Sequence, residues 1–236
     1  MKIIVISSNK YANLLNGFAN QFNKYWPGME VIALCYNKPK INLPSNFEVI
    51  SVGIDDTYWT NLLIPFFLEI TDDHLIVFLE DHFIVHPVDQ NLLKSALNEI
   101  VSKRVSKVLL GEDAHQSNWK KYDDKFLEWM PTSLNCYAPV SLTPSIWTKN
   151  IFLEFLQPNW TASEFESKNI KKSIKMGFKT IKTNNFPICL DVDVCRNGSF
   201  NKRILEIKDN MITLGKKQYY IDDLDINSLY SAYEKR

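Results

Sequence analysis

The chain has 236 residues, of which 45% are hydrophobic and 13% aromatic, and this aromatic content excludes a low-complexity disordered chain. Its 27 basic and 27 acidic residues cancel, which argues against a dedicated nucleic-acid binder, because such a protein needs a basic excess to neutralise phosphates. The length suits one large domain or two small ones. We expect one domain over residues 1–202 and an accessory segment over residues 203–236.

Membrane and redox features favour a cytoplasmic protein. The longest candidate for a membrane span, residues 62–70, contains Pro65 and Glu69 and is shorter than the roughly 18 residues that a bilayer requires. The apolar run at the N-terminus is too short for a signal peptide. The four cysteines are scattered without a Cys-x-x-Cys pair, which favours reduced thiols. Peripheral contact with the inner face of the membrane stays open, as does the oligomeric state.

Short apolar strands and helices alternate over the first 110 residues. The pattern predicts strands at 2–7, 31–34, 47–52, 75–79 and 107–110, and helices at 11–25, 58–70 and 88–102, the last with Val101 on its buried side. This alternation predicts a parallel sheet built from right-handed crossovers.

The second half of the chain is less regular. We expect strands at 126–130, 137–142, 179–182 and 188–194, and helices at 146–156 and 163–176. In the tail, residues 204–207 and 211–214 predict a hairpin turning at Asp209-Asn210. Residues 218–221 predict a further strand and residues 226–233 a closing helix.

Three polar clusters follow predicted strands: Ser7-Ser8-Asn9, Glu80-Asp81-His82 and Glu112-Asp113. In open α/β sheets, ligands bind beyond the carboxyl ends of the strands, so these clusters are candidate binding residues. The first strand is followed by neither Gly-x-Gly-x-x-Gly nor Gly-Lys-Ser/Thr, which disfavours the common dinucleotide-binding and P-loop folds.

The cluster after residues 75–79 is the most informative. Adjacent acids at the end of a buried strand need water or a ligand to satisfy their charge. Oxygen ligands suit Mg²⁺ or Mn²⁺, which would offset charge on a leaving diphosphate, so we expect a metal site at Asp81 with Glu80 and His82. The alternative is that these acids only start a loop or cap a helix.

Several short segments, in this order, resemble a family of bacterial and viral GT-A-like glycosyltransferases associated with surface-polysaccharide genes. They are residues 7–11 with 22–27, Tyr58-Trp59, residues 75–83 as the counterpart of a DXD motif, residues 141–147 with 163–166, and residues 196–198. The resemblance implies a Rossmann-type mixed sheet with helices on both faces, followed by the C-terminal hairpin and helix. It also implies a nucleotide-sugar donor, a glycan or lipid-linked glycan acceptor, and a divalent cation.

The resemblance and the strand-end positions together suggest ligand contacts. For the donor we expect Ser7, Ser8, Asn9, Tyr11, Trp59 and Arg196, and for the acceptor Trp147 and Trp160. Each has a structural alternative. Ser8 or Asn9 could simply cap a helix, Arg196 could be an ordinary surface residue, and Trp160 could belong to the core.

The general base of an inverting transfer would be a carboxylate, and the candidates are Asp113, Glu164 and Glu166. Helical spacing places Glu164 among lysines, with Lys168 four residues later, and Glu166 nearer the apolar edge. We therefore favour Glu166 as the base, while a capping-box role stays open for both glutamates.

The sequence therefore predicts a metal-dependent glycosyltransferase for surface polysaccharide. Two alternatives remain: a nucleotidyltransferase, which the loop Ser-Ser-Asn-Lys-Tyr without glycine disfavours, and a non-catalytic module that binds nucleotide sugars or glycans.

Overall fold

The computed structural model describes residues 1–53, 57–102, 104–112, 118–130, 139–196, 199–201, 204, 207, 209–214 and 217–221, with Leu62 and Arg196 described as backbone only. The first half of the chain builds four parallel strands in the order β3-β2-β1-β4. Their bounds are β1 Lys2–Ser7, β2 Val31–Cys35, β3 Phe47–Ser51 and β4 His74–Leu79. Helix α1 (Leu14–Tyr25) connects β1 to β2, after a short 3-10 turn at Asn9–Tyr11, and α2 (Trp59–Glu69) connects β3 to β4. The predicted parallel crossovers are confirmed.

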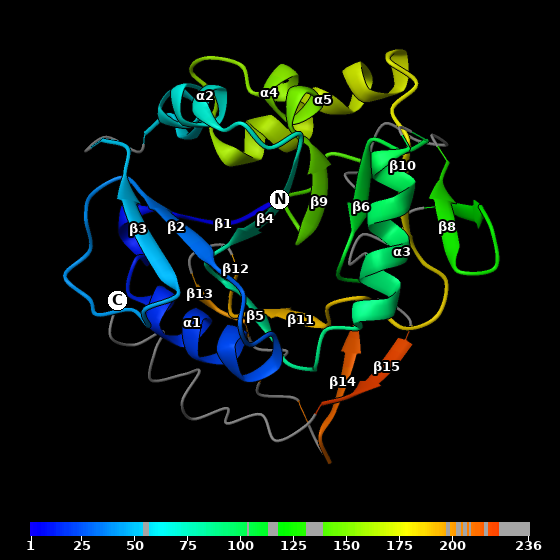
Figure 1. Cartoon of the computed structure of the whole chain (residues 1–236), viewed down its shortest axis with the longest axis horizontal. Helices are drawn as coiled ribbons and strands as arrows, with labels where there is room; N and C mark the ends of the chain where they lie inside the picture. The colour runs from blue at the N-terminus through cyan, green and yellow to red at the C-terminus, as the bar shows by residue number, and fades with distance from the viewer. Residues whose placement is uncertain are drawn as a thin grey trace.

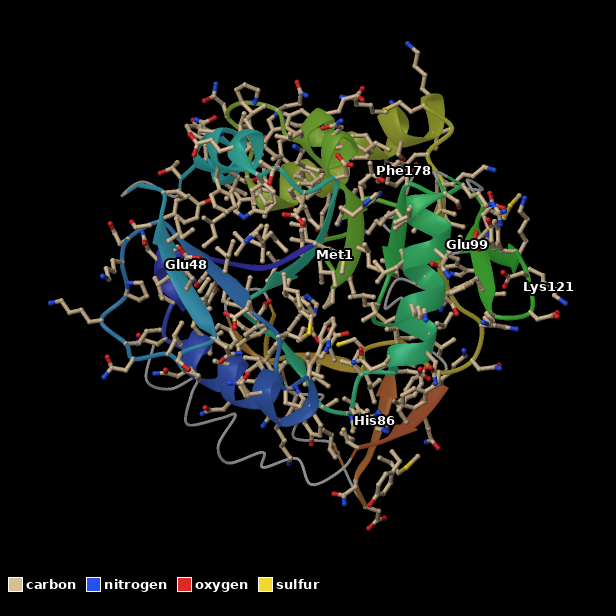
Figure 2. All side chains as sticks on the ribbon, in the orientation of Figure 1. Met1, Glu48, His86, Glu99, Lys121 and Phe178 are labelled. Atoms are coloured by element: carbon tan, nitrogen blue, oxygen red, sulfur yellow. The ribbon has the colours of Figure 1, made fainter. Side chains whose placement is uncertain are left out.

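The second half extends this sheet to nine strands, in the order β3-β2-β1-β4-β9-β6-β10-β8-β7. The added strands are β6 Lys107–Leu109, β7 Trp119–Lys121, β8 Phe126–Trp129, β9 Ser145–Thr148 and β10 Thr180–Thr183. Strand β9 runs antiparallel between β4 and β6, while β10 is parallel to β6. Glu48 on β3 and Lys121 on β7 mark the two edges of this mixed sheet (Figure 2).

Helices cover both faces of the sheet, as predicted. Along β1, Ile3 and Val5 face α1 and α3 (Gln90–Val101), whereas Ile4 and Ile6 face α2, α4 (Lys149–Phe155) and α5 (Ala162–Lys175). In Figure 1, α2, α4 and α5 form one layer at the top, and α1 lies on the opposite side. The alternation of β1 side chains thus builds two separate cores.

Three predictions for residues 88–156 need correction. Residues 146–148 belong to strand β9 rather than to a helix, and only Lys149–Phe155 is helical, because Ile146 and Trp147 are buried between two strands. Within the predicted strand 137–142, residues 139–142 form a turn and an irregular segment. Val101 is 59% exposed at the end of α3, where the helix leaves the core.

The remaining strands form small sheets beside the main one. Strand β5 (His82–Ile84) pairs with β11 (Asp191–Asp193), and β12 (Cys195–Arg196) pairs with β13 (Ser199–Phe200). The C-terminal hairpin joins β14 (Met211–Leu214) to β15 (Lys217–Tyr220), so its predicted first strand was wrong: Ile204 is helical. Asp209 and Asn210 do turn, with positive φ, but before β14. The predicted helix 226–233 lies outside the described residues.

The hairpin packs onto the α1–α3 core. Ile212, Tyr219 and Ile221 are buried there together with side chains of β1 and α1. None of the helices in the described parts of the chain combines the length and apolar character needed to cross a bilayer.

Candidate functional site

The carboxyl ends of β1 and β4 meet, because Ile6 of β1 pairs with Leu79 of β4. Immediately beyond them, the backbone N–H and the hydroxyl of Ser8 both donate to Glu80 Oε1, each at 3.1 Å. Glu80 is 5% exposed, and burial together with the charge of Asp81 raises the pKa of its carboxyl to about 8. Two polar clusters that are 72 residues apart in the sequence therefore form one site.

Asp81 lies at the centre of this site with one oxygen unused. Its backbone carbonyl accepts from the N–H of Val194 at 2.7 Å, but its buried Oδ1 has no hydrogen-bond partner among the described residues. Burial raises the pKa of Asp81 to about 6. The charge of His82 lowers this pKa, and the charge of Asp193 raises it further. A buried carboxylate oxygen without a partner is costly, so this arrangement calls for a ligand.

His82, which is partly buried, pairs with the buried Asp191 next to Asp81. The pairing of β5 with β11 brings His82 Nδ1 within 2.6 Å of Asp191 Oδ2. Burial alone would lower the pKa of His82, but the hydrogen bond and charge of Asp191 outweigh it and raise this pKa to about 10. The neighbouring Asp193 is oriented by Asn201, whose Nδ2 donates to Asp193 Oδ1 at 2.7 Å.

The end of β6 closes the other side of Asp191. A Cβ at Gly111 would lie 2.2 Å from Asp191 Oδ1, so only glycine lets the carboxylate approach the backbone here. Next to it, Glu112 forms an ion pair with Lys182 and accepts a hydrogen bond from the hydroxyl of Tyr219. The C-terminal hairpin is therefore tied to the strand end that adjoins the site.

The predicted metal triad does not converge. Glu80 faces Ser8 and His82 faces Asp191, and no three His, Cys, Asp or Glu side chains in the described residues form a metal-binding group. Asp81 still fits the expected cation without that triad, because Mg²⁺ is commonly held by one or two carboxylates together with substrate phosphates and water. Its Oδ1, unpartnered among the described residues, would supply one such ligand, and Asp193 lies near enough to raise the pKa of Asp81.

The predicted donor residues fall into two groups. Ser7 has no exposed surface, so it makes no contact with a ligand as it stands, whereas Ser8, Asn9 and Tyr11 are half-buried at the site's edge. Asn9 Oδ1 accepts from the N–H of Asn37 at 2.9 Å. The side chain of Ser8 makes no helix-capping hydrogen bond, so the capping alternative fails for it. Asp113 and the side chain of Arg196 lie outside the described residues.

The tryptophans were partly misassigned. Trp147 is fully buried and Trp59 is 8% exposed, and both pack among aromatic rings of the α2–α4–α5 core. The expected contacts of Trp147 and Trp59 with ligands are therefore corrected, because their surfaces are used in packing. Trp160 is half-buried, with Lys168 Nζ 5.2 Å from the centre of its ring.

The two glutamates of α5 behave differently from each other, as predicted. Glu164 completes a capping box with Thr161 and pairs with Lys168 at 2.6 Å, and these hydrogen bonds lower its pKa to about 2. Glu166 is half-buried, and its Oε1 accepts from the N–H of Leu142 at 2.7 Å. This bond anchors the segment leading into β9, and the role of Glu166 as a base stays a prediction.

Sequence reasoning missed Asp191, Asp193 and Gly111. A usable pattern was present, because Asp191-Val192-Asp193 alternates acids with an apolar residue inside a predicted strand. Such alternation places both carboxylates on one face. Their position beside His82 depends on the pairing of β5 with β11, which no local sequence pattern predicts.

Comparison with known proteins supports the fold. No protein-family model and no curated protein matches this sequence. Among solved structures, residues 1–349 of S. aureus TarS in complex with UDP-GlcNAc superpose with a TM-score of 0.50 at 13% identity, covering 85% of this chain and 60% of that one. The chain is similar to TarS in fold.

Two further solved structures superpose less closely. A CMP:2-keto-3-deoxy-manno-octonic acid synthetase complexed with CTP has a TM-score of 0.45 at 10% identity, covering 76% of this chain and 88% of that one. A cytidylyltransferase from Leptospira borgpetersenii has a TM-score of 0.47 at 10% identity, covering 99% and 93%.

Proposed function

We propose that this chain is a glycosyltransferase that moves a sugar from a nucleotide-sugar donor to a hydroxyl of a glycan or lipid-linked glycan, in surface polysaccharide synthesis. One observation carries the proposal: Asp81, just beyond the carboxyl end of the central strand β4, keeps a buried oxygen that no described residue engages. In a sheet of this kind, that edge is where ligands bind. TarS, which is similar in fold, is described in complex with UDP-GlcNAc.

The residues at the site have separate roles in this proposal. Ser8, Asn9 and Tyr11 line the edge where the nucleoside would lie, and Arg196 would meet a phosphate. Asp81, with Asp193, would hold Mg²⁺ or Mn²⁺. When bound, this cation would offset the charge of the departing diphosphate. The paired His82 and Asp191 fix the floor of the site, since their 2.6 Å contact and the close approach to Gly111 hold the imidazole ring and the carboxylate in place.

The proton of the acceptor hydroxyl must go to a base. Glu166 is our first candidate, because it is half-buried at the start of α5 and, among the described residues, only its Oε1 is engaged, by the N–H of Leu142. Asp113, directly after Glu112, is the second. Trp160 would present a ring face to the acceptor sugar.

Titration of UDP, UDP-GlcNAc and CTP with and without Mn²⁺ tests the proposal, in the wild type and in Asp81→Asn. Nucleotide should bind the wild type only with Mn²⁺, and the variant should bind more than about 100-fold more weakly. Asp124→Asn, an exposed acid paired with Lys121, is the matched control. Equal binding by Asp81→Asn and the wild type would refute the assignment.

Product analysis separates the proposal from a nucleotidyltransferase. A glycosyltransferase releases a nucleoside diphosphate from a nucleotide sugar, whereas a nucleotidyltransferase releases pyrophosphate from a nucleoside triphosphate. Pyrophosphate release from CTP with a sugar acceptor would favour the second reaction. Binding without either product, with a range of acceptors, would favour a non-catalytic module.

A further inference from the structure

Helix α2 exposes two apolar residues on its outer side, next to the exposed Glu69 at its end. Its inner stripe of Trp59, Leu63 and Phe67 is buried in the α2–α4–α5 core, as expected for a surface helix. The opposite side should then be polar, but it carries the exposed residues Pro65 and Leu68, and Leu68 is 64% exposed. These two residues are one turn apart and therefore adjacent on the helix surface.

Helix α5 carries a basic stripe on its outer side. Four lysines follow one another along the helix without an acid between them: Lys168, Lys171, Lys172 and Lys175. The exposed Met176 comes directly after the helix, and the exposed Lys179 three residues later. Lys168 pairs with Glu164, and Lys172 pairs with Glu154. In the described residues, neither Lys171 nor Lys175 takes part in an ion pair, so both charges face solvent.

The two helices belong to one layer. The rings of Trp59 and Phe165 join α2 to α5 at 5.4 Å, and the rings of Phe67 and Phe152 join α2 to α4 at 4.9 Å. All three helices cover the same face of the sheet, and Figure 1 shows them side by side. Their outer sides therefore point away from the sheet in the same general direction.

We propose that this outer surface, defined by Pro65, Leu68, Lys171, Lys175 and Met176, docks onto an anionic lipid bilayer. Interfacial helices bury apolar side chains at the boundary between headgroups and acyl chains, and lysines beside them meet lipid phosphates. A second copy of the chain would cover the apolar residues but would bring the same positive charge. The combination of exposed leucine, methionine and unpaired lysines is complementary to a negatively charged membrane. This inference is independent of the reaction proposed above.

Vesicle co-sedimentation tests it with the full chain. The wild type should sediment with vesicles of phosphatidylcholine and phosphatidylglycerol, and release as salt is raised, because lysine–lipid attraction is screened. Leu68→Glu should weaken binding at least about tenfold. The double variant Lys171→Glu/Lys175→Glu should lose about tenfold or more, and pure phosphatidylcholine should bind the wild type poorly.

Matched controls lie elsewhere on the molecule. Val101→Glu changes an apolar residue of similar exposure on α3, across the sheet, and Lys121→Glu reverses an exposed lysine on β7. Both should bind as the wild type does. The proposal is wrong if the wild type stays in solution with anionic vesicles, or if the control variants lose binding as much as Leu68→Glu. It is equally wrong if Leu68→Glu only converts a dimer to a monomer in analytical ultracentrifugation.

Discussion

Carboxylates gather at two places in this molecule, the end of strand β4 and the start of helix α5. At α5, Glu164 accepts from Thr161 and pairs with Lys168, and Glu166 accepts from Leu142. At β4, Glu80 and Asp81 are buried side by side, their pKa values are raised, and Asp81 Oδ1 has no partner in the described residues. Glu164, which builds structure, is satisfied by Thr161 and Lys168, whereas Asp81 keeps an oxygen that no described residue satisfies and that a ligand could engage.

The largest effect is expected for a substitution of Glu166. If it is the base, Glu166→Gln should lower turnover by about 10²–10⁴-fold, because glutamine cannot accept the proton. If it only anchors the segment before β9, glutamine keeps an acceptor oxygen for Leu142 and turnover should barely change. Glu164→Gln is the matched control and should leave turnover intact. Steady-state kinetics corrected for the folded fraction would decide, and normal turnover in Glu166→Gln would end its candidacy.

A second test uses the burial of Glu80. Its pKa rises from 4.5 to about 8, so between these values the folded protein binds a proton that the unfolded chain releases. The free energy of unfolding should therefore fall as pH rises through this interval. Glu80→Gln removes the charge but keeps an acceptor for Ser8, so the decline should flatten. Urea unfolding at several pH values checks this, with exposed Glu48→Gln (Figure 2) as the control. A variant with an unaltered slope would contradict the assignment.

The third test adds a methyl group beside Asp191, which pairs with His82 next to Asp81. Gly111→Ala places a methyl group against Asp191 Oδ1, and overpacking of this kind should cost about 3 kcal/mol of unfolding free energy. If the carboxylate is the obstacle, the same change should cost much less in an Asp191→Ala background. Urea unfolding of the four proteins in this double-mutant cycle measures the coupling. Additive effects would show that the obstacle is something else.

The smallest effect is expected at Glu112, whose carboxylate is paired within the chain, as that of Glu164 is. Tyr219→Phe removes one hydrogen bond to a charged group and should cost about 2 kcal/mol of unfolding free energy, while Lys182 remains as a partner. Tyr220→Phe, at the next position and 53% exposed, should cost almost nothing. Equal melting temperatures for the two variants would mean that the hairpin is not held through Tyr219.

Much of the fold could be predicted from the sequence because its strands and helices show clear local hydrophobic periodicity. The strands and helices of residues 2–110 are separate apolar runs, and parallel crossovers follow from their alternation. The prediction for residues 146–156 was wrong because it also relied on local periodicity. A short apolar run directly before a helix has no period of its own, so Ser145–Thr148 merged with α4.

Only part of the candidate site could be predicted from the sequence. Ser8 and Glu80 could be brought together because both follow parallel strands, and the carboxyl ends of such strands share one edge. Asp191 could not, because its place beside His82 depends on the register of β5 against β11. The buried positions of Ser7 and Trp147 likewise depend on how helices pack onto the sheet, which composition does not reveal.

The insertion of β9 between β4 and β6 has a consequence for biosynthesis. Both neighbours leave the ribosome before β9 does, so each keeps an unpaired edge until Ser145–Thr148 has been made. Unpaired edges are templates for pairing with other chains, and contacts between distant segments form slowly. Nascent or truncated chains that end before Ser145 are therefore exposed to aggregation, and the central strand β4, which leads into Asp81, gains its second neighbour only late in translation.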